Sequence, residues 1–279
     1  DNILVQTPVY YPFYRAIEMN QRKLLKNELL IEDGRYVIDF DDLEQKMKQA
    51  KIFILCSPHN PISRVWDRDE LDKMAELAAR YDVFVISDEI HCDFSFTKKH
   101  TVFSKVARDH GVKHLLAFSA SKTFSLAGLN VASIVIEDPV LRDRYAERVR
   151  TDGVNTHSTF GFAAAEAGYT ECDDWYEKML DTVYQNYRLL KDYVVENMPL
   201  VHVFDLEGTY LAWLDFRALD VDHETLEKHM VDHCLYLDEG YIFGEGGRGF
   251  ERINLACPRR VIEAALGRLK AVYDDLLGE

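Results

Sequence analysis

The residues of this chain that are best suited to covalent chemistry lie in one short stretch, Ser119 to Lys122. Lys122 closely follows an apolar run, Leu115–Phe118, that predicts a buried strand. In open α/β sheets, ligands bind at the carboxyl ends of the strands. A lysine amine there can condense with a carbonyl compound while nearby serine hydroxyls hold a phosphate. A single lysine after a strand is more often a solvated loop residue, so this interpretation depends on the neighbouring strands.

Three other predicted strands also end in side chains that can act on a ligand. The first is followed by Tyr10, the second by Asn60, and the third by Asp88 and His91. Taken singly, such residues usually serve as packing, turn or capping residues. The carboxyl ends of neighbouring parallel strands meet at one edge of a sheet, so we expect these side chains to share a pocket with Lys122.

The chemistry of such a pocket suits one cofactor, pyridoxal 5'-phosphate. A carboxylate such as Asp88 beside a pyridine nitrogen favours the protonated ring, because an opposite charge stabilises the cation. The protonated ring then serves as an electron sink. An asparagine amide can hydrogen-bond the phenolic oxygen of the ring, and an aromatic side chain can stack on its face.

Composition limits the possible partners. The chain has 279 residues, of which 47% are hydrophobic, and a formal net charge of -15. This acidity argues against nucleic acid as a partner. No apolar run reaches membrane-spanning length, and no signal peptide is visible. The five cysteines are scattered without a disulfide pattern, so we expect a cytoplasmic protein that acts on a small molecule.

The order of the predicted elements indicates an α/β fold with a mainly parallel sheet. Buried strands are predicted at Ile52–Leu55, Val83–Ile86 and Leu115–Phe118, and a segment with helical periodicity, Asp67–Tyr81, separates the first two. A long amphipathic helix is predicted over Asp174–Asn197, and further strands and helices are predicted after it. We therefore expect a large domain over residues 1–172 and a smaller C-terminal α+β domain over residues 173–279.

Five motifs in order along the chain resemble those of a known family, the fold-type I pyridoxal-phosphate enzymes of aminotransferase class I/II. Within this family the chain is most similar to the MalY/PatB group of cystathionine β-lyases. The motifs that carry the resemblance are Ser57–Pro61, Asp88–His91, Ser119–Phe124, Glu207–Trp213 and Phe250–Arg259.

The resemblance implies a role for each matching residue. Lys122 would be the covalent lysine and general base, and Arg252 would hold the substrate α-carboxylate as a bidentate fork. The implied cofactor-binding residues, with their contacts, are Asp88 (pyridine nitrogen), Asn60 and His91 (phenolic oxygen), Tyr10 (ring face), and Ser119 and Ser121 (phosphate).

The chain departs from the family pattern in two ways that bear on function. Aminotransferases of the family carry a phosphate-binding arginine eight residues beyond the lysine, where this chain has Asn130, which favours the lyase group. The family also has an N-terminal segment, with a phosphate-binding helix start and residues that reach the partner subunit. That segment is expected to be absent here, since the chain begins at Asp1 within a predicted strand.

The leading functional prediction is a carbon–sulfur β-lyase that cleaves cystathionine or cysteine-like amino acids to a thiol, pyruvate and ammonia. An aminotransferase is the alternative, because the same residues serve both reactions. A non-catalytic regulatory protein that keeps the fold is a third possibility, suggested by the expected absence of the N-terminal segment. The resemblance also implies a homodimer.

Three other patterns support weaker hypotheses. Gly244–Gly249 matches a dinucleotide-binding string, but a strand is predicted after it where that motif requires a helix. His229 and His233 have metal-ligand spacing on a predicted helix, where a solvated face is the simpler interpretation. Asp88, His91 and Asp93 can be grouped as metal ligands, which leaves Lys122 unexplained. The sequence contains no Gly-x-Ser-x-Gly motif of a serine hydrolase.

Overall fold

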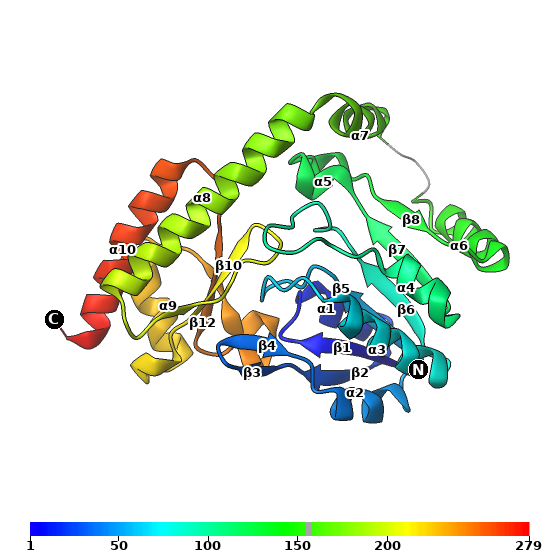
Figure 1. Cartoon of the computed structure of the whole chain (residues 1–279), viewed down its shortest axis with the longest axis horizontal. Helices are drawn as coiled ribbons and strands as arrows, with labels where there is room; N and C mark the ends of the chain where they lie inside the picture. The colour runs from blue at the N-terminus through cyan, green and yellow to red at the C-terminus, as the bar shows by residue number, and fades with distance from the viewer. Residues whose placement is uncertain (155–157, 279) are drawn as a thin grey trace.

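The computed structural model describes residues 1–154 and 158–278. The chain forms two main sheets and one long helix, α8 (Asp173–Asn197), which Figure 1 shows running from α7 across to the second sheet. No helix in the described part of the chain is long and apolar enough to cross a membrane.

The first sheet has six strands in the order β2-β1-β5-β6-β7-β8. All its neighbouring pairs are parallel except β7 and β8, which are antiparallel. This confirms the predicted α/β class and the mainly parallel sheet. The strands are β1 (Asn2–Thr7), β2 (Lys23–Glu28), β5 (Ile52–Cys56), β6 (Phe84–Asp88), β7 (His114–Phe118) and β8 (Ser133–Val135).

The two faces of this sheet are covered differently. Strand register aligns Leu4, Phe53 and Val85 on one face, where all three are fully buried. Residues of three helices join them in one hydrophobic core: α2 (Phe40–Met47), α3 (Arg68–Arg80) and α4 (Phe103–His110). The apolar spacing within each helix explains this packing, since residues three and four apart lie on one face.

On the opposite face, α1 (Pro12–Met19) packs Ile17 against Ile3 and Val5. Farther along this face, Ile54 and Ile86 remain half-buried. These two side chains line a shallow apolar hollow beside Asp88, described below.

The second sheet is antiparallel, with four strands in the order β11-β12-β10-β9. Its core joins residues of the sheet to α8 and the two C-terminal helices, including Leu190, Leu214 and Leu266. Its elements are β9 (His202–Val203), β10 (Leu211–Asp215), α9 (His223–Asp232), β11 (Asp238–Glu239), β12 (Phe250–Asn254) and α10 (Arg259–Leu277).

The remaining elements are short or peripheral. A separate hairpin is formed by β3 (Leu30–Glu32) and β4 (Arg35–Val37). The remaining α-helices are α5 (Ala120–Thr123), α6 (Pro139–Thr151) and α7 (Thr159–Glu171). In the sequence, residues 155–169 are a mixed stretch rich in alanine, and residues 155–157 of it lie outside the described part of the chain. The domain boundary between residues 172 and 173 stays a prediction.

Candidate active site

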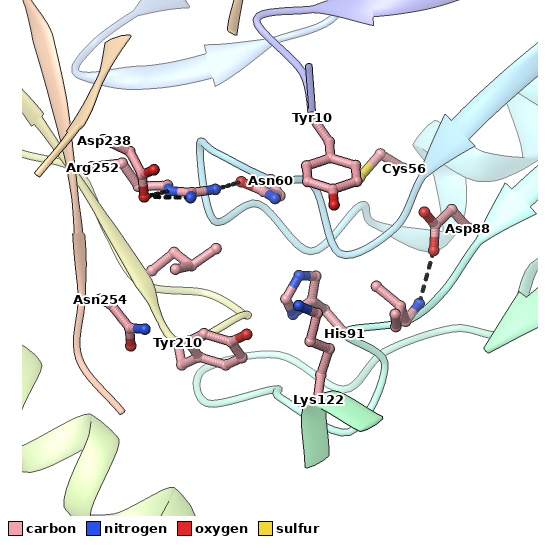
Figure 2. A pocket seen from close by; sticks show the side chains of 12 residues that line it. Tyr10, Cys56, Asn60, Asp88, His91, Lys122, Tyr210, Asp238, Arg252 and Asn254 are labelled. Carbon is pink, nitrogen blue, oxygen red and sulfur yellow. Dashed lines mark hydrogen bonds and ion pairs between the residues drawn. The ribbon is translucent and has the colours of Figure 1, made fainter. Parts of the chain in front are cut away.

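One cavity of about 260 Å³ collects most of the predicted site residues, as Figure 2 shows. It lies where the carboxyl ends of β5 and β6 face the second sheet, with Lys122 of α5 on its wall. The lining residues are Tyr10, Cys56, Asn60, Asp88, Ile90, His91, Lys122, Tyr210, Leu211, Asp238, Arg252 and Asn254. Six of the eight predicted site residues are therefore brought together.

Asp88 ends β6 and presents a buried carboxylate to this cavity. Its Oδ1 accepts a hydrogen bond from the backbone N–H of Ile90 at 3.1 Å, and it forms no ion pair within the described residues. Burial raises the pKa of Asp88 to about 6. A buried carboxylate of this kind is stabilised by a cationic N–H, which is what a protonated pyridine ring supplies.

His91 and Lys122 extend into the same part of the cavity (Figure 2). The His91 side chain is buried, and its Nδ1 atom has no hydrogen-bond partner among the described residues. Burial, together with the positive charges of Lys122 and Arg252, lowers the pKa of His91 to about 3. The imidazole is therefore neutral at physiological pH and keeps a polar atom available for a ligand.

Asn60 and Tyr10 form another wall of the cavity. The Asn60 Oδ1 atom accepts a hydrogen bond from Arg252 Nη1 at 2.8 Å, which leaves the amide nitrogen as a donor for a ligand. The Tyr10 ring packs edge-on against Phe13, with ring centroids 5.6 Å apart. Burial raises the pKa of Tyr10, so its hydroxyl remains neutral.

Arg252 reaches the cavity from β12 of the second sheet. Its Nε and Nη2 atoms donate to Asp238 Oδ2 of β11, at 3.2 and 2.5 Å. Its guanidinium lies over the ring of Phe243, 4.6 Å from the ring centroid. The arginine is thus fixed in position, as a bidentate carboxylate receptor requires.

Ser119 and Ser121 do not line this cavity. Ser119 caps α5: its hydroxyl accepts from Ser121 N at 3.0 Å and donates to Val131 O at 2.5 Å. Ser119 does line the adjacent apolar hollow, which shares Asp88 and Ile90 with the main cavity. The phosphate-binding role of both serines stays a prediction.

The side chains present fit pyridoxal 5'-phosphate. An unpaired buried carboxylate, an available amide nitrogen, an unpartnered imidazole nitrogen and a lysine converge on one cavity. These groups match three atoms of the cofactor: the carboxylate matches the ring nitrogen, the amide and the imidazole match the phenolic oxygen, and the lysine matches the aldehyde carbon.

Sequence reasoning missed several lining residues. Tyr210 belongs to the Glu207–Trp213 motif but was assigned no role. Asn254 lies two residues beyond Arg252 on β12, and the two-residue strand period could have identified it. Asp238 reaches the cavity because it is the cross-strand partner of Arg252.

The structure also bears on the weaker hypotheses. Asp93 does not line the cavity, and it accepts hydrogen bonds from Thr123 and Tyr169, at 2.7 and 3.2 Å. The Gly244–Gly249 stretch leads into strand β12, as predicted, so the dinucleotide-binding context is not met. His233 pairs with Asp275 at 2.7 Å. No group of metal-ligating side chains large enough to hold an ion occurs within residues 1–154 and 158–278.

Comparison with known proteins identifies the family. Residues 1–269 match aminotransferase class I and II. The chain belongs to this family. It is 36% identical over 275 residues to cystathionine beta-lyase PatB of Bacillus subtilis, covering 97% of this chain and 71% of that protein. It is 35% identical over 274 residues to protein MalY of Escherichia coli, covering 96% and 70%.

A solved structure agrees with this assignment. Cystalysin from Treponema denticola, which contains pyridoxal 5'-phosphate, superposes with a TM-score of 0.94 at 41% identity. The match covers 99% of this chain and 71% of cystalysin. The predicted family and fold type are confirmed, and membership of this family supports an enzyme that depends on pyridoxal 5'-phosphate.

Proposed function

We propose that this protein is a pyridoxal 5'-phosphate-dependent carbon–sulfur β-lyase acting on cystathionine or related cysteine-like amino acids. The observation that carries the proposal is the convergence of Lys122 from α5, Asp88 from β6 and Arg252 from β12 on one cavity. The curated relatives named above, PatB and MalY, support the lyase reaction through the name of PatB and the likeness of both sequences.

Each of the main side chains of the cavity has its own role in the reaction. Arg252 holds the α-carboxylate of the substrate and fixes the position of Cα. Lys122 is the nearby amine that accepts the Cα proton. Asp88 keeps the ring nitrogen of the cofactor protonated, while Asn60 and His91 bind its phenolic oxygen. The bound cofactor supplies the electron sink that makes the Cα proton acidic.

Elimination then follows from the position of sulfur on Cβ. The proton on Cα passes to Lys122, and the Cβ–S bond breaks with its electron pair leaving on sulfur as a thiolate. A double bond forms between Cα and Cβ. The resulting 2-aminoacrylate takes up water and gives pyruvate and ammonia, so the overall reaction needs no external oxidant or acceptor.

The decisive experiment uses the purified protein loaded with pyridoxal 5'-phosphate and supplied with cystathionine. We expect pyruvate to form without any added 2-oxo acid, and borohydride treatment to attach the cofactor to Lys122. The matched control is Lys113→Ala, which removes an exposed lysine that pairs with Asp82. Strict dependence on a 2-oxo acid would show an aminotransferase, and failure to bind the cofactor would favour a non-catalytic role.

Asn130 is a weaker argument against transamination than the sequence indicates. Its backbone is left-handed, with φ of 52°, where it ends the short helical turn Ala127–Leu129. Asparagine adopts this conformation more readily than arginine, which gives a local reason for its presence. The choice between elimination and transamination therefore rests on the relatives and on the experiment above.

We also propose a cytoplasmic homodimer. All five cysteines are free, which fits a reducing compartment. Exposed apolar side chains, including Val140 (61%) and Phe160 (80%), lie on α6 and α7, the two helices that follow β8 in the chain (Figure 1). An exposed apolar region of this kind is typical of a protein–protein interface. Light scattering coupled to size-exclusion chromatography tests the dimer, and a monomer at micromolar concentration would contradict it.

A further inference from the structure

Arg252, the proposed receptor for the substrate carboxylate, already holds a carboxylate of this chain. Asp238 faces it across the β11–β12 pair, and one Asp238 oxygen accepts hydrogen bonds from both Nε and Nη2 of Arg252. The third guanidinium nitrogen, Nη1, donates to Asn60. A ligand carboxylate must therefore bind an arginine whose charge is already offset.

The positions of the two side chains make this pairing accessible to a ligand. Both line the cavity, yet the Arg252 side chain is only 11% exposed, whereas that of Asp238 is 43% exposed (Figure 2). Arg252 is additionally held by the Phe243 ring and by Asn60. Asp238 is thus the more accessible member of the pair, and its charge faces any anion that approaches the arginine.

The charge of Asp238 affects the binding of two classes of ligand differently. An α-amino acid carries an ammonium group close to its carboxylate, so repulsion of the carboxylate by Asp238 is partly cancelled by attraction of the ammonium. A 2-oxo acid carries the same carboxylate without the ammonium, and its repulsion by Asp238 is not cancelled. Transamination differs from β-elimination in requiring a 2-oxo acid as the acceptor of the amino group.

We propose that Asp238 is a specificity-determining residue whose carboxylate weakens the binding of 2-oxo acids at Arg252 relative to α-amino acids. This disfavours transamination and leaves elimination as the main reaction. The inference rests on the proposed function, because it takes Arg252 as the carboxylate receptor. It adds a residue that selects between two reactions available to the same side chains.

Two substitutions separate the charge of Asp238 from its geometry. Asp238→Asn keeps the shape and an oxygen acceptor for Arg252 but removes the negative charge. Asp238→Ala removes both the charge and the acceptor. Glu239→Gln is the matched control, because it removes a charge at the next position of β11, where the side chain points to the other face of the sheet.

The first measurement is inhibition of the elimination reaction by pyruvate. In Asp238→Asn we expect pyruvate to inhibit at a concentration roughly threefold to tenfold lower than in the unsubstituted protein, as expected for one partly screened charge. The KM for the amino-acid substrate should change less than the pyruvate inhibition constant. Glu239→Gln should leave both constants close to those of the unsubstituted protein.

The second measurement needs no turnover and is the thermal stabilisation of the cofactor-loaded protein by pyruvate. A ligand that binds the folded state raises the melting temperature. A fixed pyruvate concentration should therefore raise the melting temperature of Asp238→Asn more than that of the unsubstituted protein. Unchanged or weaker pyruvate binding in Asp238→Asn by both measurements overturns the proposal. Asp238→Ala could weaken the binding of both ligand classes while Asp238→Asn binds both as the unsubstituted protein does. In that case Asp238 only orients Arg252, and the proposal is wrong. Absence of elimination, with the thermal effect intact, would contradict the lyase function alone.

Discussion

Glu207 and Arg64 form a buried ion pair that joins the start of the Glu207–Trp213 motif to the loop that carries Asn60. Arg64 Nε donates to Glu207 Oε2 at 3.0 Å, and the two side chains are 3% and 8% exposed. The same Oε2 atom accepts from the backbone N–H of Val65 at 3.0 Å, and Oε1 accepts from Arg35. Glu207 therefore holds three separate parts of the chain together close to the cavity.

We predict that Glu207→Gln destabilises the protein by about 3 kcal/mol. Removing one member of a buried ion pair typically costs about 3–5 kcal/mol. Arg64 keeps its second ion pair, with Glu70 at 2.8 Å, and glutamine retains part of the hydrogen bonding, so we expect a loss at the lower end of this range. The measurement is the free energy of unfolding in urea. Glu263→Gln breaks an exposed pair with Arg259 and should cost less than about 1 kcal/mol. Similar losses in the two variants would refute the assigned role.

Asp88 gives a prediction about stability and pH in the cofactor-free protein. Burial raises its folded-state pKa to about 6 from a usual value of 3.8. Between these pH values the folded state binds more protons than the unfolded state, so stability falls as pH rises from about 4 to about 6 and stays lower above that range. The ionised carboxylate therefore costs stability at neutral pH when no cofactor is bound.

Asp88→Asn should remove this cost. At pH 8 we expect the cofactor-free variant to be more stable than the unsubstituted protein by up to about 3 kcal/mol, from a difference of roughly two pKa units. The advantage should disappear near pH 4, and the loaded variant should catalyse elimination more slowly. Melting temperatures at both pH values provide the measurement. An advantage that does not vary with pH would contradict the role of ionisation.

Arg252→Lys tests the carboxylate receptor. Lysine keeps the positive charge but cannot present the bidentate fork or contact Asn60 and Asp238 in the same geometry. We expect KM to rise about tenfold to a hundredfold, with a smaller effect on kcat. Steady-state kinetics measure both parameters, and Arg259→Lys on α10 is the control. A variant with unchanged KM would show that the substrate carboxylate binds elsewhere.

Much of the candidate site could be predicted because its residues follow apolar strands. Asp88 and Lys122 each follow a run of apolar residues, and parallel topology alone places such strand ends at one edge. The contribution of the second sheet could not be predicted in this way. β11 has only two residues, Asp238 and Glu239, and its place depends on pairing with β12.

Two further elements that the sequence analysis did not predict, β2 and α4, also have local explanations. β2 was not predicted because its sequence, Lys-Leu-Leu-Lys-Asn-Glu, alternates weakly and includes a buried polar residue, Asn27. Asn27 is satisfied by hydrogen bonds from its amide to Asp39 and Asp42, which only the folded chain brings near. Helix α4 was also missed, although Phe103, Val106 and Ala107 have helical spacing.

His91 leads to a prediction that separates hydrogen bonding from proton transfer. Burial, with the charges of Lys122 and Arg252, lowers the pKa of His91 to about 3, so the ring should stay neutral from pH 5 to pH 9. NMR of the ring nitrogens should show no protonation in that range. Protonation near pH 6.5 would contradict the buried, charge-crowded environment.

The neutral imidazole then acts only through a hydrogen bond to the cofactor. His91→Asn keeps a polar side chain that can donate, whereas His91→Phe does not. We expect kcat/KM to fall about tenfold or more in the phenylalanine variant and less in the asparagine variant, because one hydrogen bond to a charged group contributes about 1.5–3 kcal/mol. His110→Phe, at a surface position that pairs with Asp72, is the control. Equal losses in the two His91 variants would show that packing of the ring, and not its hydrogen bond, is what catalysis requires.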